Sequence, residues 1–176
     1  MAIKKQITFE GLTYNLDDRD RVAAAVALEV PEIDSWYPNG VTAITNATTA
    51  LAAGYIHTIV DVDGGANVIP TLGRGQRIKA FIKGGITSNT ITFTTTSGQT
   101  FHTNSWALTQ DIVDGSDLTV QASTATAGDN TITLNGGTKG GQGGDELTFI
   151  GVSSTLVYCE LRLNGVGTIA TPFSTV

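Results

Sequence analysis

Cysteine, charge and long apolar runs are all scarce in this chain. The single cysteine among 176 residues is Cys159, and one thiol cannot form an intramolecular disulfide. The cysteine content therefore gives no indication of an oxidising compartment. No apolar run approaches the ~20 residues that a membrane-spanning helix needs. No apolar segment follows the basic start at Lys4 and Lys5, so we expect neither a membrane partner nor a signal peptide.

Charged residues make up only 15% of the chain, against about 25% in ordinary globular domains. The balance is acidic, with a formal net charge of −6 and a pI of about 4.7. Because phosphate backbones are bound through Lys and Arg, this balance disfavours nucleic acid as a partner. Threonine, glycine, serine and asparagine supply the polar surface instead. Such a composition is more common in extracellular β modules and virion proteins than in cytosolic enzymes.

One short phrase occurs twice. Residues 89–93 read NTITF and residues 130–134 read NTITL, and in both copies apolar residues alternate with threonine. Alternation with β-branched residues predicts strands that have one face in a core and the other toward water. The flanks of the two copies do not align. We therefore interpret the copies as two strands of one sheet that meet the same demands, rather than as an internal duplication.

More runs of this kind fill residues 54–165, each closed by Gly, Asn, Asp or Ser. We predict strands over residues 55–62, 76–83, 90–96, 100–104, 117–122, 130–135, 145–152 and 155–164. In the last of these, alternation places Cys159 on the core face as a small apolar residue. Short strands at even spacing are typical of sandwiches and jelly rolls. The predicted fold class is all-β, an antiparallel β-sandwich or jelly-roll-like body over residues 54–165 with a C-terminal tail over residues 166–176.

The residues before this body form a predicted N-terminal arm, residues 1–53. Two short β patterns, residues 7–9 and 12–16, flank Glu10-Gly11 and predict a small hairpin. Asp17 and Asp18 offer an N-cap to an Ala-rich segment, which predicts a short helix over residues 18–28.

The rest of the arm has no clean period. Pro31 ends the predicted helix, and we expect a linker from there to residue 53 in which residues 48–53 form one helical turn. Trp36 and Tyr37 allow two interpretations. They pack the arm against the body, or they anchor it to another subunit or protein, since aromatic residues are enriched at interface cores.

No arrangement of residues indicates catalysis or metal binding. Residues 61–64 resemble the start of a calcium loop, but Ala66 and Leu72 stand where later ligands are needed. His57 and His102 are the only histidines, and among so many Ser and Thr they define no triad. The glycine run over residues 136–144 lacks the spacing of a nucleotide loop, so we predict a flexible loop. We expect no enzymatic activity, no cofactor and no metal.

One predicted strand has a basic face. Within residues 76–83, apolar residues alternate with an opposite face that carries Arg77, Lys79, Phe81 and Lys83. One interpretation is a solvated outer face, or lysines that protect an edge strand from mispairing. The other is a docking surface for an acidic partner. The sequence leaves both open.

The opening of the chain, Lys4 to Arg21 with ITF at residues 7–9 and TYNLD at residues 13–17, resembles the N-terminal arms of small tailed-bacteriophage virion proteins. The threonine-rich strands with Gly and Asn turns are similar to the β-sandwich modules of phage head-decoration (cement) proteins, head fibres and tail-fibre tips. This resemblance implies a protein without a catalytic site that binds the outside of an assembled capsid, often as a trimer.

We therefore expect a capsid decoration or head-fibre protein, made in the host cytoplasm and located on the outer capsid surface, with the major capsid protein and its own copies in a homotrimer as partners. The expected partner-binding residues are Ile7, Phe9, Tyr14, Trp36, Tyr37, Arg77, Lys79, Phe81 and Lys83. The alternative is a receptor- or glycan-binding tip module of a tail fibre, with Trp106, Phe101 and His102 as its aromatic platform. A polysaccharide-active enzyme is a third hypothesis, and it requires two facing carboxylates.

Overall fold

The computed structural model describes residues 6–9, 12–15, 37–44, 48–60, 64–87, 89–112 and 120–176. Within these ranges the chain forms strands, turns and loops, so the all-β class is confirmed for the described part. The chain divides into two units, residues 1–35 and residues 36–176. The predicted helix over residues 18–28 lies outside the described residues.

The smaller unit contains the predicted hairpin. β1 (Gln6–Phe9) and β2 (Leu12–Asn15) pair antiparallel, with Ile7 opposite Tyr14 and Phe9 opposite Leu12. The hairpin prediction is therefore confirmed.

The larger unit begins well before residue 54. β3 (Gly40–Ile44) pairs in parallel with β5 (Tyr55–Ile59), and β4 (Thr48–Ala50) pairs in parallel with β6 (Gly65–Ile69). Residues predicted as a linker thus belong to the sheets of the body. The helical turn predicted over residues 48–53 is wrong at residues 48–50, where two β-branched threonines favour a strand.

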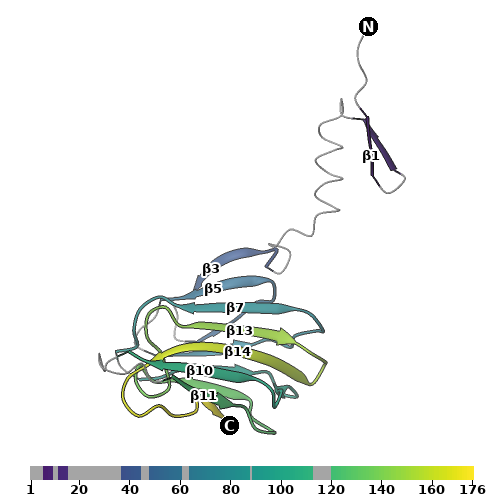
Figure 1. The fold of residues 1–176 in the computed structure, drawn as a ribbon. Helices are drawn as coiled ribbons and strands as arrows, with labels where there is room; N and C mark the ends of the chain where they lie inside the picture. Colours follow the sequence, from purple (N-terminus) through teal and green to yellow (C-terminus); the bar gives the residue numbers. More distant parts are fainter. Residues whose placement is uncertain are drawn as a thin grey trace. The chain divides into compact units, whose positions relative to one another are not determined.

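Two mixed sheets make up the larger unit. The remaining strands are β7 (Arg77–Ile82), β8 (Ile91–Thr95), β9 (Thr100–Phe101), β10 (Trp106–Asp111), β11 (Val120–Thr124), β12 (Thr131–Leu134), β13 (Glu146–Gly151), β14 (Leu156–Gly165) and β15 (Phe173–Ser174). The eight-stranded sheet has the order β11-β10-β14-β13-β7-β5-β3 (Figure 1). In addition, β9 pairs with β14. The five-stranded sheet has the order β15-β12-β8-β6-β4.

The strands from β3 to β8 follow a coiled path. They alternate between the two sheets, so that β3, β5 and β7 are parallel neighbours in one sheet and β4, β6 and β8 are parallel neighbours in the other. β14 also pairs in parallel with β10, although it pairs antiparallel with β13. The prediction of antiparallel sheets is therefore wrong for these pairs. Local alternation marks a strand but carries no information about which strand becomes its neighbour.

The twin NTIT segments lie side by side. β8 and β12 pair antiparallel, with Phe93 opposite Ile132 and Ile91 opposite Leu134. All four of these side chains are fully buried, whereas Thr92 and Thr133 of the same strands are only partly buried. The interpretation as two strands of one sheet is confirmed.

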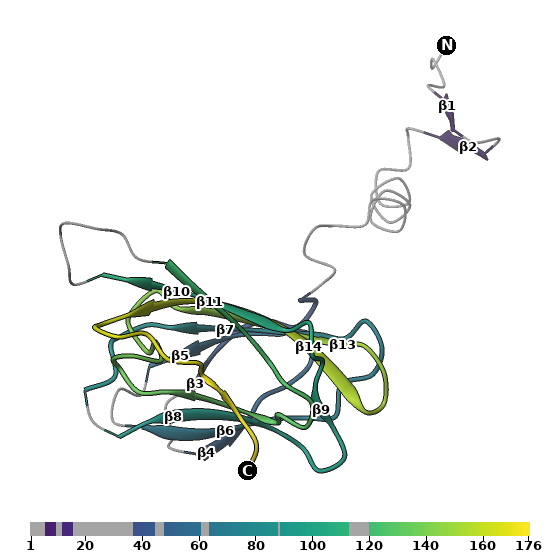
Figure 2. The same cartoon turned by 60° about the horizontal axis from the view of Figure 1, so that its bottom comes forward.

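The core lies between the two sheets, which form two layers (Figure 2). Phe93 of one sheet packs on Phe149 of the other with ring centroids 5.9 Å apart. Phe101 and Phe173 make a second contact between the layers at 6.1 Å. Cys159 is fully buried in this core, as predicted, and burial raises the pKa of its thiol to about 12.

The glycine run that was predicted as a flexible loop is held by hydrogen bonds. The Asn135 side-chain oxygen accepts from the main-chain N–H groups of Gly137 and Lys139 at 3.0 and 2.9 Å. Gly141 has a φ of +101°, and a Cβ there would lie 2.5 Å from the Ile86 side chain. Glycine is therefore required at this position for both backbone conformation and space.

Candidate binding face on the eight-stranded sheet

The outer face of the eight-stranded sheet carries Arg77, Lys79 and Phe81 of β7 together with Trp106 of β10. Alternation along β7, β13, β14 and β10 sends one set of side chains into the core, and Ala80, Leu147, Leu161 and Ala107 are fully buried there. The opposite set consists of Arg77, Lys79, Phe81, Glu146, Thr148, Tyr158, Glu160, Arg162, Asn164, Trp106, Leu108 and Gln110. The strand register brings these side chains, which are distant in sequence, into neighbouring rows.

The basic residues of β7 do not form a purely positive surface. The Lys79 ammonium lies 2.6 Å from a carboxylate oxygen of Glu146 on the neighbouring strand, and both side chains are partly exposed. The same ammonium lies 4.9 Å from the centre of the Phe81 ring, a cation–π geometry. Lys83 lies just beyond the end of β7 and is exposed. Glu146 thus balances the charge of Lys79, and sequence alternation along a single strand could not show this partner.

Tyr37 lies against the same face. Its side chain is partly buried and forms a hydrogen bond with that of Thr148. Burial raises the pKa of the Tyr37 hydroxyl, and the nearby positive charge of Arg77 opposes this shift. Tyr37 therefore contacts the body, as the first interpretation of the aromatic pair has it. Its neighbour Trp36 lies outside the described residues, as do the side chains of the hairpin residues Ile7, Phe9 and Tyr14.

A polar chain runs from Trp106 to Glu160. The Trp106 indole N–H donates to the Tyr158 hydroxyl at 3.0 Å, and that hydroxyl donates to a Glu160 carboxylate oxygen at 3.2 Å. Burial raises the pKa of the Tyr158 hydroxyl. Trp106 and Tyr158 are thus the aromatic pair of this face.

The predicted aromatic platform of Trp106, Phe101 and His102 is wrong in its second member. Phe101 is 1% exposed and packs inside the core against Phe173. The ring nitrogen Nδ1 of His102 accepts from the main chain of Asn104 at 3.0 Å and so belongs to a local turn. Phe101 lies on β9 and Trp106 on β10, and the aromatic neighbour of Trp106 is Tyr158 on the parallel strand β14, far away in the sequence.

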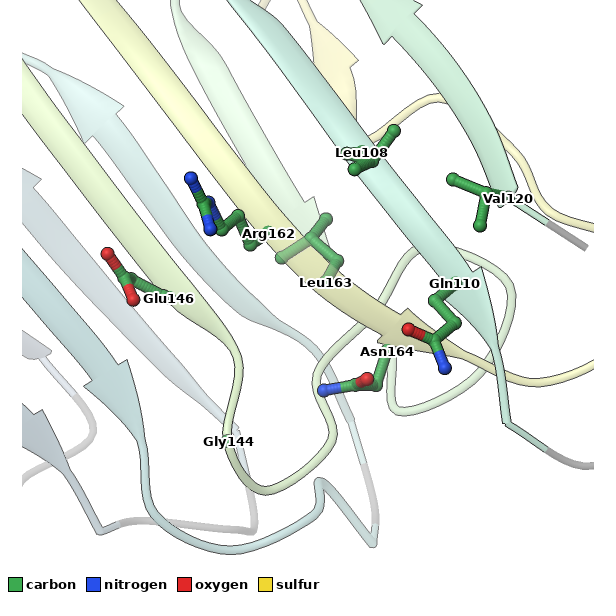
Figure 3. A pocket seen from close by; sticks show the side chains of 8 residues that line it. All are labelled: Leu108, Gln110, Val120, Gly144, Glu146, Arg162, Leu163 and Asn164. Carbon is green, nitrogen blue, oxygen red and sulfur yellow. The ribbon is translucent and has the colours of Figure 1, made fainter. Parts of the chain in front are cut away.

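A pocket of about 340 Å³ lies at one end of this outer face (Figure 3). Its lining combines the exposed side chains of Leu108 and Val120 with amides and charges. It consists of Leu108, Gln110, Val120, Gly144, Glu146, Arg162, Leu163 and Asn164. Gln110 on β10 and Asn164 on β14 are register partners and lie next to each other at its floor.

A buried carboxylate fixes the position of Asn164. Asp145 is fully buried, and one of its oxygens accepts from the Asn164 main-chain N–H at 2.7 Å and from the Asn164 side-chain NH₂ at 3.0 Å. The other oxygen accepts from the Gly141 N–H at 2.6 Å. Burial raises the pKa of Asp145, and the hydrogen bonds oppose this shift. The only signal of this site in the sequence was an acid that directly follows a glycine run, a position that also suits a plain turn.

The described residues also bear on a metal site and on a membrane-spanning helix. The calcium-like residues 61–63 lie outside the described ranges. Among the residues that the structure describes, no group of three or more His, Cys, Asp or Glu is placed to hold a metal ion. In that same part of the chain, no helix is long and apolar enough to cross a membrane.

Comparisons of the chain with protein-family models, with curated proteins and with solved structures gave no match.

Proposed function

We propose that this chain is a non-enzymatic structural protein of a tailed-bacteriophage particle, a capsid decoration or head-fibre protein that binds the outside of the assembled shell. The observation that carries the proposal is the division of the chain into a short N-terminal unit, residues 1–35, and a larger unit, residues 36–176. The larger unit encloses its own apolar core. We therefore expect the larger unit to fold without residues 1–35. This N-terminal unit, called the arm from here on in place of residues 1–53, can serve a separate partner.

In this proposal the larger unit is a β-sandwich module and the arm is the attachment device. The major capsid protein is the partner of the arm, and Ile7, Phe9 and Tyr14 of the hairpin supply apolar contacts to it. The body supplies the contact between three copies. The low charge content and the threonine-rich strands support a role on an exposed particle surface.

The mechanism is stabilisation by mass action. A protein that binds the assembled shell but not its separate subunits lowers the free energy of the assembled state by RT ln(1 + [L]/Kd). At a free concentration 100 times the Kd, this amounts to about 2.7 kcal/mol for each site. No catalytic group is required for such a function.

The basic residues Arg77, Lys79 and Lys83 on and just beyond β7 are a second candidate for contact with the capsid. Their geometry makes them a weaker candidate than the arm. Since Lys79 already binds Glu146, an acidic partner would have to displace that carboxylate. We expect a variant with Arg77, Lys79 and Lys83 replaced by Gln to bind particles within about threefold of the unchanged chain. A loss of binding in a variant that still folds would instead assign the shell contact to this face.

The location of the protein on purified phage particles tests the proposal. Mass spectrometry of purified particles measures its presence, and electron microscopy with a labelled antibody measures its position. We expect the label over the outer shell. A label on the tail would support the tail-fibre alternative, and absence from particles would contradict the virion assignment.

A further inference from the structure

The pocket beside Gln110 and Asn164 has hydrogen-bonding groups that the fold itself does not use. Among the described residues, none forms a hydrogen bond or ion pair with the side chains of Gln110 or Arg162. Asn164 donates its NH₂ group to Asp145, which leaves its amide oxygen directed away from that carboxylate. Three polar side chains of two neighbouring strands thus offer both donors and acceptors at one place.

The orientation of Asn164 is built into the core. Asp145 is fully buried and is held by the glycine loop through the Gly141 N–H. Its two hydrogen bonds to Asn164 fix both the main chain and the amide plane. A polar group whose rotamer is fixed in this way loses little entropy when it binds a ligand. This separates Asn164 from an ordinary surface amide.

Apolar surface lies beside these polar groups. Leu108 is 42% exposed and Val120 is 46% exposed, and both line the pocket. The two charged side chains that line the pocket, Glu146 and Arg162, are opposite in sign. A strongly charged ligand gains little from such a surface, whereas a neutral ligand with many hydroxyl groups and an apolar side fits it.

We propose that this pocket binds a neutral pyranose unit of a polysaccharide. Gln110, Asn164 and Arg162 bind the ring hydroxyls, and Leu108 and Val120 contact the C–H face of the ring. The volume of about 340 Å³ is at the lower end of the ~300–1,000 Å³ range of small-molecule sites and suits one or two sugar rings. The Trp106–Tyr158 pair lies on the same face and would contact further sugar units of the polysaccharide.

The test uses the full chain and a panel of neutral oligosaccharides built from glucose, galactose, mannose and N-acetylglucosamine. Binding is screened on an array and measured by titration calorimetry. We expect at least one member to bind with a Kd between roughly 10 μM and 1 mM. Gln110→Ala should weaken that binding at least about tenfold, because hydroxyl recognition depends on paired polar groups.

Gln121→Ala is the matched control. Gln121 lies on β11 opposite Thr109, so its side chain is on the other face of the sheet, and it is exposed. This variant should bind as tightly as the unchanged chain. The proposal is overturned if no member of the panel binds, or if Gln110→Ala and Gln121→Ala bind equally well.

This inference does not rest on the proposed function, and sugar binding is also what the tail-fibre alternative expects. Oligosaccharide binding is measured with the isolated protein, whereas the virion assignment is measured on particles. Failure of one experiment therefore leaves the other untouched.

Discussion

His57 lies inside the core with one ring nitrogen unsatisfied. It is 2% exposed, and its Nε2 lies 3.1 Å from the main-chain nitrogen of Ala52. Within the described part of the chain, Nδ1 has no hydrogen-bond partner. Burial lowers the pKa of His57, and a hydrogen bond with the main chain of Ala52 opposes this shift only in part.

The lowered pKa makes stability depend on pH in a defined direction. Below its usual pKa of about 6.5, the unfolded chain takes up a proton on His57 before the folded chain does. The stability that neutral His57 provides is therefore complete above pH ~6.5 and is lost as the pH falls toward the folded pKa. We expect His57→Gln to reduce this loss, measured as the difference in unfolding free energy between pH 7.5 and 5.5.

His102→Gln is the control for this prediction. His102 lies in a turn and is only partly buried, so this variant shows the effect of replacing a histidine outside the core. Equal pH dependence in both variants would contradict the assignment to His57.

Cys159 provides a second residue-scale prediction. Its thiol is fully buried and burial raises its pKa to about 12, so the reactive thiolate is nearly absent at neutral pH. We expect no reaction with a thiol reagent such as dithionitrobenzoate at pH 8 in the native protein. Complete reaction should occur in guanidinium chloride. A fast reaction in native buffer would show that the β14 core face opens readily.

At the scale of single strands, the twin segments β8 and β12 show how few charges a soluble sheet needs. Their inward apolar residues fill the core, whereas Thr92, Thr94 and Thr133 face outward and are only partly buried. Phe93→Ala should lower the unfolding free energy by about 3–5 kcal/mol, because it leaves a cavity between the layers. Thr92→Ala, one position away on the opposite face, should change it by less than ~1 kcal/mol. Urea unfolding measures both, and similar costs would contradict the alternating burial.

Strands were predictable where apolar residues fill the inner positions, and they were missed where the pattern is inverted. β10 buries the polar Thr109 and exposes the apolar Leu108, which is the reverse of the usual pattern of apolar residues inside and polar residues outside. β6 buries Asn67, whose side-chain oxygen has no partner among the described residues. Both strands were absent from the predicted set for this reason. The edge strands β3 and β4 were missed because glycine, alanine and threonine give a weak apolar signal.

At the scale of the whole molecule, the pairing of strands that are distant in sequence determines which side chains meet at the candidate site. Alternation along β7 was enough to predict which of its side chains point outward. The structure places Arg77, Lys79 and Phe81 on the outer face. The partners of that row, Glu146 and Tyr37, come from other parts of the chain. The Trp106–Tyr158 pair depends on the parallel pairing of β10 with β14. Such long-range pairings are set by the packing of the complete fold, so residue patterns along the chain could not show them.

The chain divides into an arm, residues 1–35, and a body, residues 36–176. We expect a chain lacking residues 1–35 to keep the body, because every core residue that the structure describes lies within residues 36–176. Its near-ultraviolet circular dichroism and unfolding midpoint should stay close to those of the full chain. This folded body is the control that separates loss of attachment from loss of structure.

The most direct measurement is co-sedimentation of the two chains with phage particles that lack this protein. We expect the full chain to saturate the particles. The chain without residues 1–35 should remain in the supernatant although it is folded. Saturation of the particles by the truncated chain, with unchanged affinity, would contradict the account and assign attachment to the body.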